Sequence, residues 1–210
     1  EAMRRYGSDK PDLRIALELV DVAELVKDSE FAVFTGPAND AEGRVAALRI
    51  PGGAALSRKQ IDEYAAHAAK YGAKGLAWTR MHQGEVTSSY QKFLTEEENR
   101  AILARAEAED GDLILICGDA KNEVVFAALG ALRCECAKQL GILDPMDFKF
   151  LWVTEFPMFE YSEEEGRYVA MHHPFTAPMD EDFDKLETDK KNCRAKAYDI
   201  VLNGTELGGG

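Results

Sequence analysis

The chain has 210 residues, of which 46% are hydrophobic, so a packed core can form and wholesale disorder is excluded. Its formal net charge of −13 at pH 7 argues against the chain as a whole binding a polyanion such as nucleic acid. No apolar run approaches the roughly 18–20 residues that cross a bilayer, and the first residues lack the apolar core of a signal peptide. We therefore expect a cytoplasmic protein without a membrane partner.

The four cysteines are expected to be free thiols in a reducing compartment. They form no CxxC pair and no dense framework of the kind found in disulfide-rich domains. Cys134 and Cys136 are separated by one residue, but no second pair of ligands accompanies them, which argues against a zinc site.

The first part of the chain gives mixed signals. Residues 1–15 are polar and rich in turn formers. Between residues 19 and 26, apolar side chains recur at a spacing that predicts a short helix. The sequence FAVF, residues 31–34, is a short apolar run that we interpret as a strand.

Residues 25–147 alternate between predicted strands and helices, which is the pattern of a self-contained α+β unit. Strands are expected at residues 44–50, 74–81 and 112–118. The last of these runs is almost entirely apolar and is therefore predicted to be buried on both faces.

Three helices are predicted between and after these strands. Residues 57–60 and 95–98 each form a capping box, the pattern that opens a helix. Asp119 is expected to cap the third and longest helix, which Gly141 ends.

The sequence YDIVLNGTELGGG, residues 198–210, predicts a β-hairpin that carries two carboxylates. Asn-Gly between alternating apolar segments is a strong signal for a two-residue type I′ turn. With the turn at 203–204, Val201 lies opposite Glu206. Asp199 shares the face of Val201, so both carboxylates are expected on one face of the hairpin.

Two carboxylates in this arrangement, about 6–8 Å apart between their Cβ atoms, suit one hard cation held through oxygen ligands. The same register puts Gly208 opposite Asp199, and glycines at and beyond this position leave room for a bulky ligand. The alternative is a pair of exposed carboxylates on the solvated side of a hairpin, which the spacing does not exclude.

A second candidate site is MHHPFTAP, residues 171–178. Adjacent histidines on a strand point to opposite faces, so at most one of His172 and His173 can face a given site. Pro174 biases His173 toward an extended conformation. Ordinary buried or surface imidazoles are the alternative on local grounds.

Four stretches together resemble one family, the bacterial type of aspartyl-tRNA synthetase. They are RYGSDKPDLR at 5–14, FPMFEY at 156–161, MHHPFTAP at 171–178 and AYDIVLNGTELGGG at 197–210. Residues 44–78 resemble the insertion domain of that family, and a related insert occurs in the B subunit of the tRNA-dependent amidotransferase. The resemblance covers essentially the whole chain.

The resemblance implies an α+β fold in three parts. Residues 1–24 and 148–210 resemble incomplete strips of the antiparallel-sheet catalytic domain of a class II synthetase, and residues 25–147 resemble the insertion domain. The parent enzyme would be a cytoplasmic, homodimeric ligase that activates L-aspartate with ATP to aspartyl-adenylate and transfers it to tRNA. Other catalytic motifs of the family are not among these residues, so we expect the chain alone to be inactive.

The resemblance also implies roles for particular residues. Asp199 and Glu206 would hold the Mg²⁺ that bridges the phosphates of ATP, and Glu206 would thereby contact ATP. His172 would contact the bound L-aspartate, and His173 would help to shape its pocket. The wall beside the adenylate would be formed by three glycines, Gly208, Gly209 and Gly210. No side chain is expected to act as a catalytic nucleophile, because this chemistry depends on positioning and charge neutralisation.

Two other interpretations compete with this one. The insert could act alone as a non-catalytic, tRNA-associated module, but the flanking motifs favour the ligase. An unrelated metal-binding hairpin would predict tight metal binding by the chain alone. The insert also has basic residues that either meet the tRNA acceptor arm or are solvated surface charges, namely Arg44, Arg49, Arg58, Lys59, Lys70 and Lys74.

Overall fold

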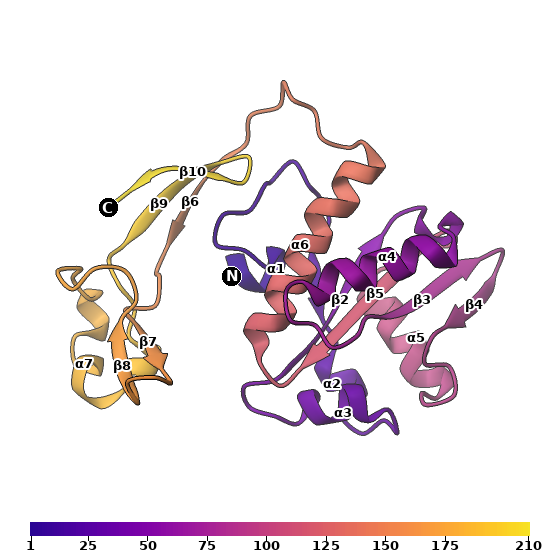
Figure 1. Ribbon diagram of the computed structural model, residues 1–210, viewed down its shortest axis with the longest axis horizontal. Helices are drawn as coiled ribbons and strands as arrows, with labels where there is room; N and C mark the ends of the chain where they lie inside the picture. The colour runs from indigo at the N-terminus through magenta and orange to yellow at the C-terminus, as the bar shows by residue number, and fades with distance from the viewer. The chain divides into compact units, whose positions relative to one another are not determined.

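The computed structural model describes residues 1–210, which form a mixed α+β protein of two compact units (Figure 1). Unit 1 comprises residues 1–9 and 14–145, and unit 2 comprises residues 10–13 and 146–210. None of the helices is both long enough and apolar enough to cross a membrane. The assignment of residues 1–24, 25–147 and 148–210 to catalytic and insertion domains concerns the parent protein and stays a prediction.

Unit 1 is built on a five-stranded antiparallel sheet with the order β1-β2-β5-β3-β4. Its strands are β1 (Leu19–Asp21), β2 (Arg44–Ile50), β3 (Ala77–His82), β4 (Glu85–Ser88) and β5 (Leu113–Asp119). The first five residues of the central strand β5 are buried, which confirms the prediction of a strand covered on both faces. The edge strand β4 was not predicted, because it is short and mostly exposed.

Helices cover both faces of this sheet (Figure 1). They are α2 (Ala23–Val26), α3 (Ala32–Ala38), α4 (Arg58–Ala69), α5 (Glu96–Arg105) and α6 (Asn122–Leu140). One core cluster joins α4 and α6 to the sheet face that carries Leu48 and Leu115. The other joins α2, α3 and α5 to the face that carries Ala47 and Ile114. Unit 1 therefore has three layers, with the sheet in the middle.

Both predicted capping boxes are confirmed. The hydroxyl of Ser57 accepts a hydrogen bond from the backbone N–H of Gln60 at the start of α4. The hydroxyl of Thr95 does the same for Glu98 at the start of α5. These local interactions satisfy N–H groups that a helix start leaves without a partner, so sequence alone locates both helix starts.

One of the predicted elements is wrong, and another is only partly correct. The run FAVF lies at the start of α3, where Phe34 is fully buried with its ring 4.7 Å from that of Phe31. A short apolar run suits a buried strand and a buried helix equally, and tertiary packing decides between them. The helix predicted between 19 and 26 is confined to α2, because Leu19–Asp21 pair with β2 as a strand.

Asp119 does not cap α6. It is the last residue of β5, and the N-cap position of α6 belongs to Lys121, which makes no side-chain cap. The carboxylate of Asp119 instead accepts a hydrogen bond from the backbone N–H of Lys121 at 3.0 Å, and so it shapes the turn between the two elements. Gly141 ends the helix in the left-handed conformation, as predicted.

All four cysteines are free thiols, as predicted. Cys117 and Cys136 lie in the larger core cluster of unit 1, and Cys193 is buried in unit 2. Burial raises the pKa of the Cys117 thiol to about 12 and that of Cys136 to about 11. These thiols are therefore protonated and unreactive in the folded protein.

A buried arginine holds the segment before β1 against α6. Arg133 of α6 is 1% exposed and donates hydrogen bonds of 2.6 Å to the carbonyl oxygens of both Ile15 and Leu17. Its guanidinium also lies 4.9 Å from the centre of the Tyr6 ring, in α1 (Ala2–Tyr6). The arginine thus satisfies buried backbone groups while its charge faces an aromatic ring.

Unit 2 contains a three-stranded antiparallel sheet with the order β10-β9-β6, together with a two-stranded β7-β8 hairpin. Its elements are β6 (Phe150–Thr154), β7 (Phe159–Ser162), β8 (Arg167–Ala170), α7 (Lys185–Thr188), β9 (Tyr198–Leu202) and β10 (Thr205–Gly209). Its core cluster consists of three buried side chains, those of Val153, Phe156 and Val201.

Candidate functional site

The predicted turn of the terminal hairpin is confirmed. Asn203 and Gly204 have φ angles of 50° and 83°, as a type I′ turn requires. The amide of Asn203 donates a 2.8 Å hydrogen bond to the carbonyl oxygen of Asp147 and accepts one of 3.0 Å from the backbone N–H of Lys149. The turn between β9 and β10 is thereby tied to the chain that leads into β6.

The predicted register of the hairpin is correct near the turn and wrong beyond it. Glu206 pairs with Val201 as expected, but a β-bulge between residues 206 and 208 shifts the ladder by one residue. Gly209, not Gly208, therefore lies opposite Asp199. A bulge adds one unpaired residue to one strand, and the sequence pattern around it gave no signal of the insertion.

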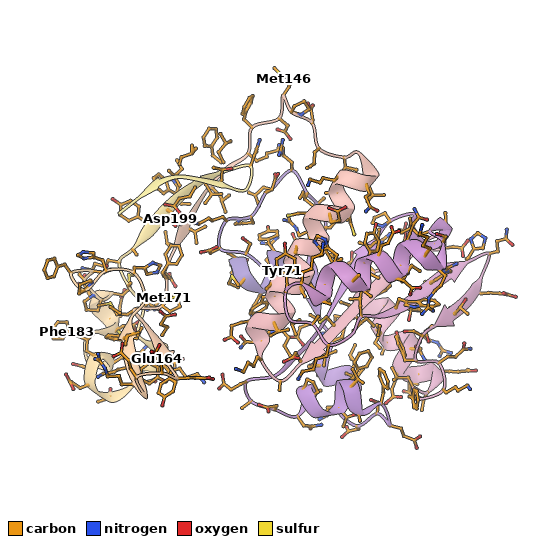
Figure 2. All side chains as sticks on the ribbon, in the orientation of Figure 1. Tyr71, Met146, Glu164, Met171, Phe183 and Asp199 are labelled. Carbon is orange, nitrogen blue, oxygen red and sulfur yellow. The ribbon has the colours of Figure 1, made fainter.

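The bulge leaves the two carboxylates on the expected face of the hairpin. Asp199 is two residues from Val201 on β9, and Glu206 lies opposite Val201 on β10. Figure 2 shows Asp199 on β9. Asp199 is half-buried beside its β6 partner Val153, and the side chain of Glu206 is 38% exposed.

The glycines at the chain end differ in what they leave room for. A Cβ atom at Gly209 would overlap the carboxylate oxygen of Asp199, so this carboxylate occupies space that only a glycine leaves open. A Cβ at Gly210 would lie 2.9 Å from the hydroxyl oxygen of Tyr198, whereas one at Gly208 would meet nothing within 4 Å. Gly209 therefore allows Asp199 its position, and Gly208 leaves the strand surface uncovered.

The donor set fits a magnesium ion that brings most of its own ligands. No group of three or more His, Cys, Asp or Glu side chains is arranged to hold a metal. Mg²⁺ is usually bound through one or two carboxylates, with water and phosphate oxygens completing its octahedron. Asp199 and Glu206 carry hard carboxylate oxygens of this kind, and no His or Cys completes a group of three with them that would favour zinc.

The structure adds a residue that the sequence did not single out. The ammonium of Lys10 lies 2.7 Å from a carboxylate oxygen of Glu206. Lys10 belongs to the motif RYGSDKPDLR, which reads as a polar loop when taken alone. Only the fold brings this loop to the hairpin.

The two histidines lie in a bend and at the start of a turn rather than on a strand, so the argument from alternating strand faces does not apply to them. The backbone N–H of Thr176 donates a 3.0 Å hydrogen bond to the carbonyl oxygen of His173. The ring of His172 contacts Phe156 edge-on at 4.8 Å, and that of His173 contacts Phe175 at 5.2 Å. Both histidines are exposed, and each packs against a different aromatic ring.

A buried ion pair holds the loops around the histidine turn. Asp182 is 1% exposed and accepts a 2.7 Å hydrogen bond from the guanidinium of Arg194 and a 3.0 Å one from its backbone N–H. Hydrogen bonds from Arg194 and then from Lys185 hold the pKa of Asp182 far below its usual range. Isolated β-bridges at Pro157–Arg194 and Pro178–Ala195 continue from this point.

The basic residues of unit 1 are largely engaged with carboxylates. Arg49 lies 2.6 Å from Asp112, and Arg58 lies 2.9 Å from Asp62. Arg44, Lys59 and Lys74 also form ion pairs, with Asp21, Glu63 and Asp119 respectively. These pairs favour the interpretation as structural and surface charges over a dedicated tRNA contact.

The chain is similar to known proteins over its whole length. The GAD domain family matches residues 34–129, which lie within unit 1. The aspartate–tRNA ligase of Stenotrophomonas maltophilia (strain K279a) is 62% identical over all of this chain, which corresponds to 36% of that protein. That of Xanthomonas campestris pv. campestris (strain 8004) is 59% identical over the same shares. These matches confirm the resemblance to aspartyl-tRNA synthetases.

The matches also give the share of these relatives that the chain covers. The chain spans about a third of the length of the curated relatives it matches, 36% in each case, and the match covers the whole chain, unit 2 included. The aspartate–tRNA ligase of Xanthomonas oryzae pv. oryzae (strain PXO99A), 58% identical, gives the same coverage. Both the region matched by the GAD domain family and the segment with the carboxylate hairpin are therefore similar to parts of aspartate–tRNA ligases.

Proposed function

We propose that this chain is the part of an ATP-dependent aspartate–tRNA ligase that joins the insertion domain to the metal- and ATP-binding hairpin of the catalytic domain. The parent enzyme activates L-aspartate with ATP and passes the aspartyl group to tRNA. It works in the cytoplasm as a homodimer. The support for this activity is the 62% identity over the whole chain to a protein of that name.

In this proposal Asp199 and Glu206 are the protein ligands of Mg²⁺ bound with ATP. The ion, when bound, supplies Lewis-acid stabilisation of charge on the phosphates and a template that orients them. The two carboxylates hold their oxygens toward one face of the hairpin. Gly208, Gly209 and Gly210 form the wall beside the adenylate in this proposal, and Gly208 leaves the strand surface uncovered there.

The histidine turn supplies the amino-acid pocket in the same proposal. His172 contacts the bound L-aspartate, and His173 shapes the pocket beside it. The observed contact between His172 and Phe156 gives the imidazole a fixed support on the small core of unit 2. No residue of this chain acts as a nucleophile, since attack comes from the carboxylate of the substrate.

One observation carries the proposal for the site: the type I′ turn and the Val201–Glu206 pairing bring two carboxylates from different strands to one face. A straight strand would place residues seven apart on opposite faces. The hairpin alone is therefore sufficient to bring the two carboxylates to one face.

The test uses the parent enzyme with Asp199→Asn and Glu206→Gln. Each variant is expected to lower aspartate-dependent exchange between ATP and pyrophosphate about 100-fold or more, because a preorganised charge on the reacting phosphates is lost. The control is Glu160→Gln, which changes an exposed carboxylate on β7. Equal exchange in wild type and both site variants would refute the assignment.

The isolated chain provides a separate test of the division between segments. Purified free of host enzyme, it is expected to show no exchange activity, because it spans only 36% of its relatives. Magnesium-dependent exchange by this chain alone would contradict the proposed dependence on the rest of the enzyme.

A further inference from the structure

The segment around Lys10 is fixed against the hairpin although the roles proposed above do not use it. Residues 10–13 belong to unit 2, and Pro11 and Asp12 within them are buried. A Cβ atom at Gly204 of the turn would lie 3.4 Å from the Cβ of Asp12 and 3.8 Å from the carbonyl oxygen of Lys10. The backbone is thus anchored at the turn, while the side chain of Lys10 extends to Glu206.

The contact between Lys10 and Glu206 is close but accessible. The ammonium and the carboxylate oxygen are 2.7 Å apart, and the two side chains are 42% and 38% exposed. An ion pair this exposed contributes little to stability and opens at small cost. The ion pair therefore matters less for stability than for whether another cation can bind to Glu206.

We propose that Lys10 is a resident counter-ion that competes with a divalent cation for Glu206; this rests on the proposed function of that carboxylate. An ammonium and a divalent cation on the same carboxylate repel each other, so binding of the cation favours displacement of the lysine. A cation that arrives with phosphate offers the displaced ammonium new anionic oxygens, whereas a free cation offers none. Lys10 thereby makes the carboxylate pair favour a metal–nucleotide over a bare ion.

The experiment measures binding of Mn²⁺ alone to the full chain, through paramagnetic broadening of the backbone amide signals of Gly208 and Gly209. Lys10→Met is expected to tighten Mn²⁺ binding about twofold to fivefold, the equivalent of one exposed ion pair. Lys10→Arg keeps the ion pair and should bind like wild type. Lys59→Met is the matched control for net charge, since Lys59 pairs with Glu63 at 4.0 Å in unit 1.

The outcomes separate this inference from the proposed function. Tighter binding in Lys10→Met alone supports it, including the case in which wild-type binding is too weak to detect. Equal binding in Lys10→Met and wild type, with binding lost in Asp199→Asn, overturns the inference and leaves the metal site standing. An equal gain in Lys59→Met also overturns it, because net charge then accounts for the effect. Broadening in no variant overturns the inference, and the exchange assay of the Asp199 and Glu206 variants then decides the proposed function by itself.

Discussion

The two compact units differ in how much apolar surface stabilises them. The two core clusters of unit 1 contain twenty and eleven buried residues, on opposite faces of one sheet. The core of unit 2 contains three, and one face of its sheet leaves Phe150, Trp152 and Tyr198 exposed. Because hydrophobic burial dominates folding stability, unit 1 is expected to be the more stable of the two.

The more stable unit is not the one that carries the proposed chemistry. Unit 1 holds the GAD domain, whereas the carboxylate hairpin, the histidine turn and Lys10 all belong to unit 2. Binding segments are generally drawn from the less stable parts of a protein. The chain has two tryptophans, Trp78 in unit 1 and Trp152 in unit 2, so the fluorescence of Trp→Phe variants can follow each unit separately.

The largest effect is expected from Leu115→Ala in β5. Leu115 is fully buried at the centre of the sheet, and its truncation leaves a cavity worth about 2–5 kcal/mol of unfolding free energy. The measurement is chemical denaturation followed by Trp78 in a Trp152→Phe background. An equal shift of the Trp152 signal in the reverse background would show that the units unfold as one and would remove the comparison.

A smaller loss is expected from Gly130→Ala in α6. Its new Cβ would lie 2.5 Å from the carbonyl oxygen of Gly7, so the backbone of α1 or α6 must move, at about 1–3 kcal/mol. The matched control is Gly36→Ala in α3, where nothing lies within 4 Å and the better helix propensity of alanine should stabilise slightly. A stabilised Gly130→Ala protein, judged by its midpoint in denaturant, would contradict the close packing of the two helices.

Thiol labelling sharpens the comparison without any mutation. Cys117 and Cys193 are each 1% exposed, and burial raises the pKa of both thiols, so alkylation requires local opening. We expect iodoacetamide to modify Cys193 of unit 2 at least about tenfold faster than Cys117, a difference of about 1.4 kcal/mol in opening free energy. Peptide mass spectrometry reports both rates, with exposed Cys134 as the fast reference. Slower labelling of Cys193 would reverse the proposed order of stability.

The smallest effect concerns Asp182→Asn and depends on pH. Because the folded protein lowers the pKa of this carboxyl, its stabilisation is complete above the ordinary pKa of about 4 and is lost as the pH falls below it. Asp182→Asn should therefore lower the midpoint temperature followed by Trp152 at pH 7, and the difference from wild type should shrink on acidification. Asp180→Asn, at a more exposed carboxylate, is the control. A difference that persists unchanged at low pH would exclude the ion pair as its cause.

Much of unit 1 could be predicted because its signals are local. The capping boxes at 57–60 and 95–98 act within one helical turn, and the run at 112–118 is apolar enough to require burial on both faces. The Asn203-Gly204 turn is local in the same sense, since asparagine and glycine are the residue types that best tolerate the positive φ angles found there. This turn, together with the alternation of side chains along a strand, was sufficient to predict that Asp199 and Glu206 lie on one face of the hairpin.

The tertiary structure decided what depends on residues distant in sequence. Phe34 is helical because Phe31 and Tyr90 surround its ring, and the bulge puts Gly209 rather than Gly208 against Asp199. Lys10 reaches Glu206 only because the fold brings the start of the chain to its end. Contacts of this kind have no periodicity in the sequence, because their partners are selected by packing in space rather than by spacing along the chain.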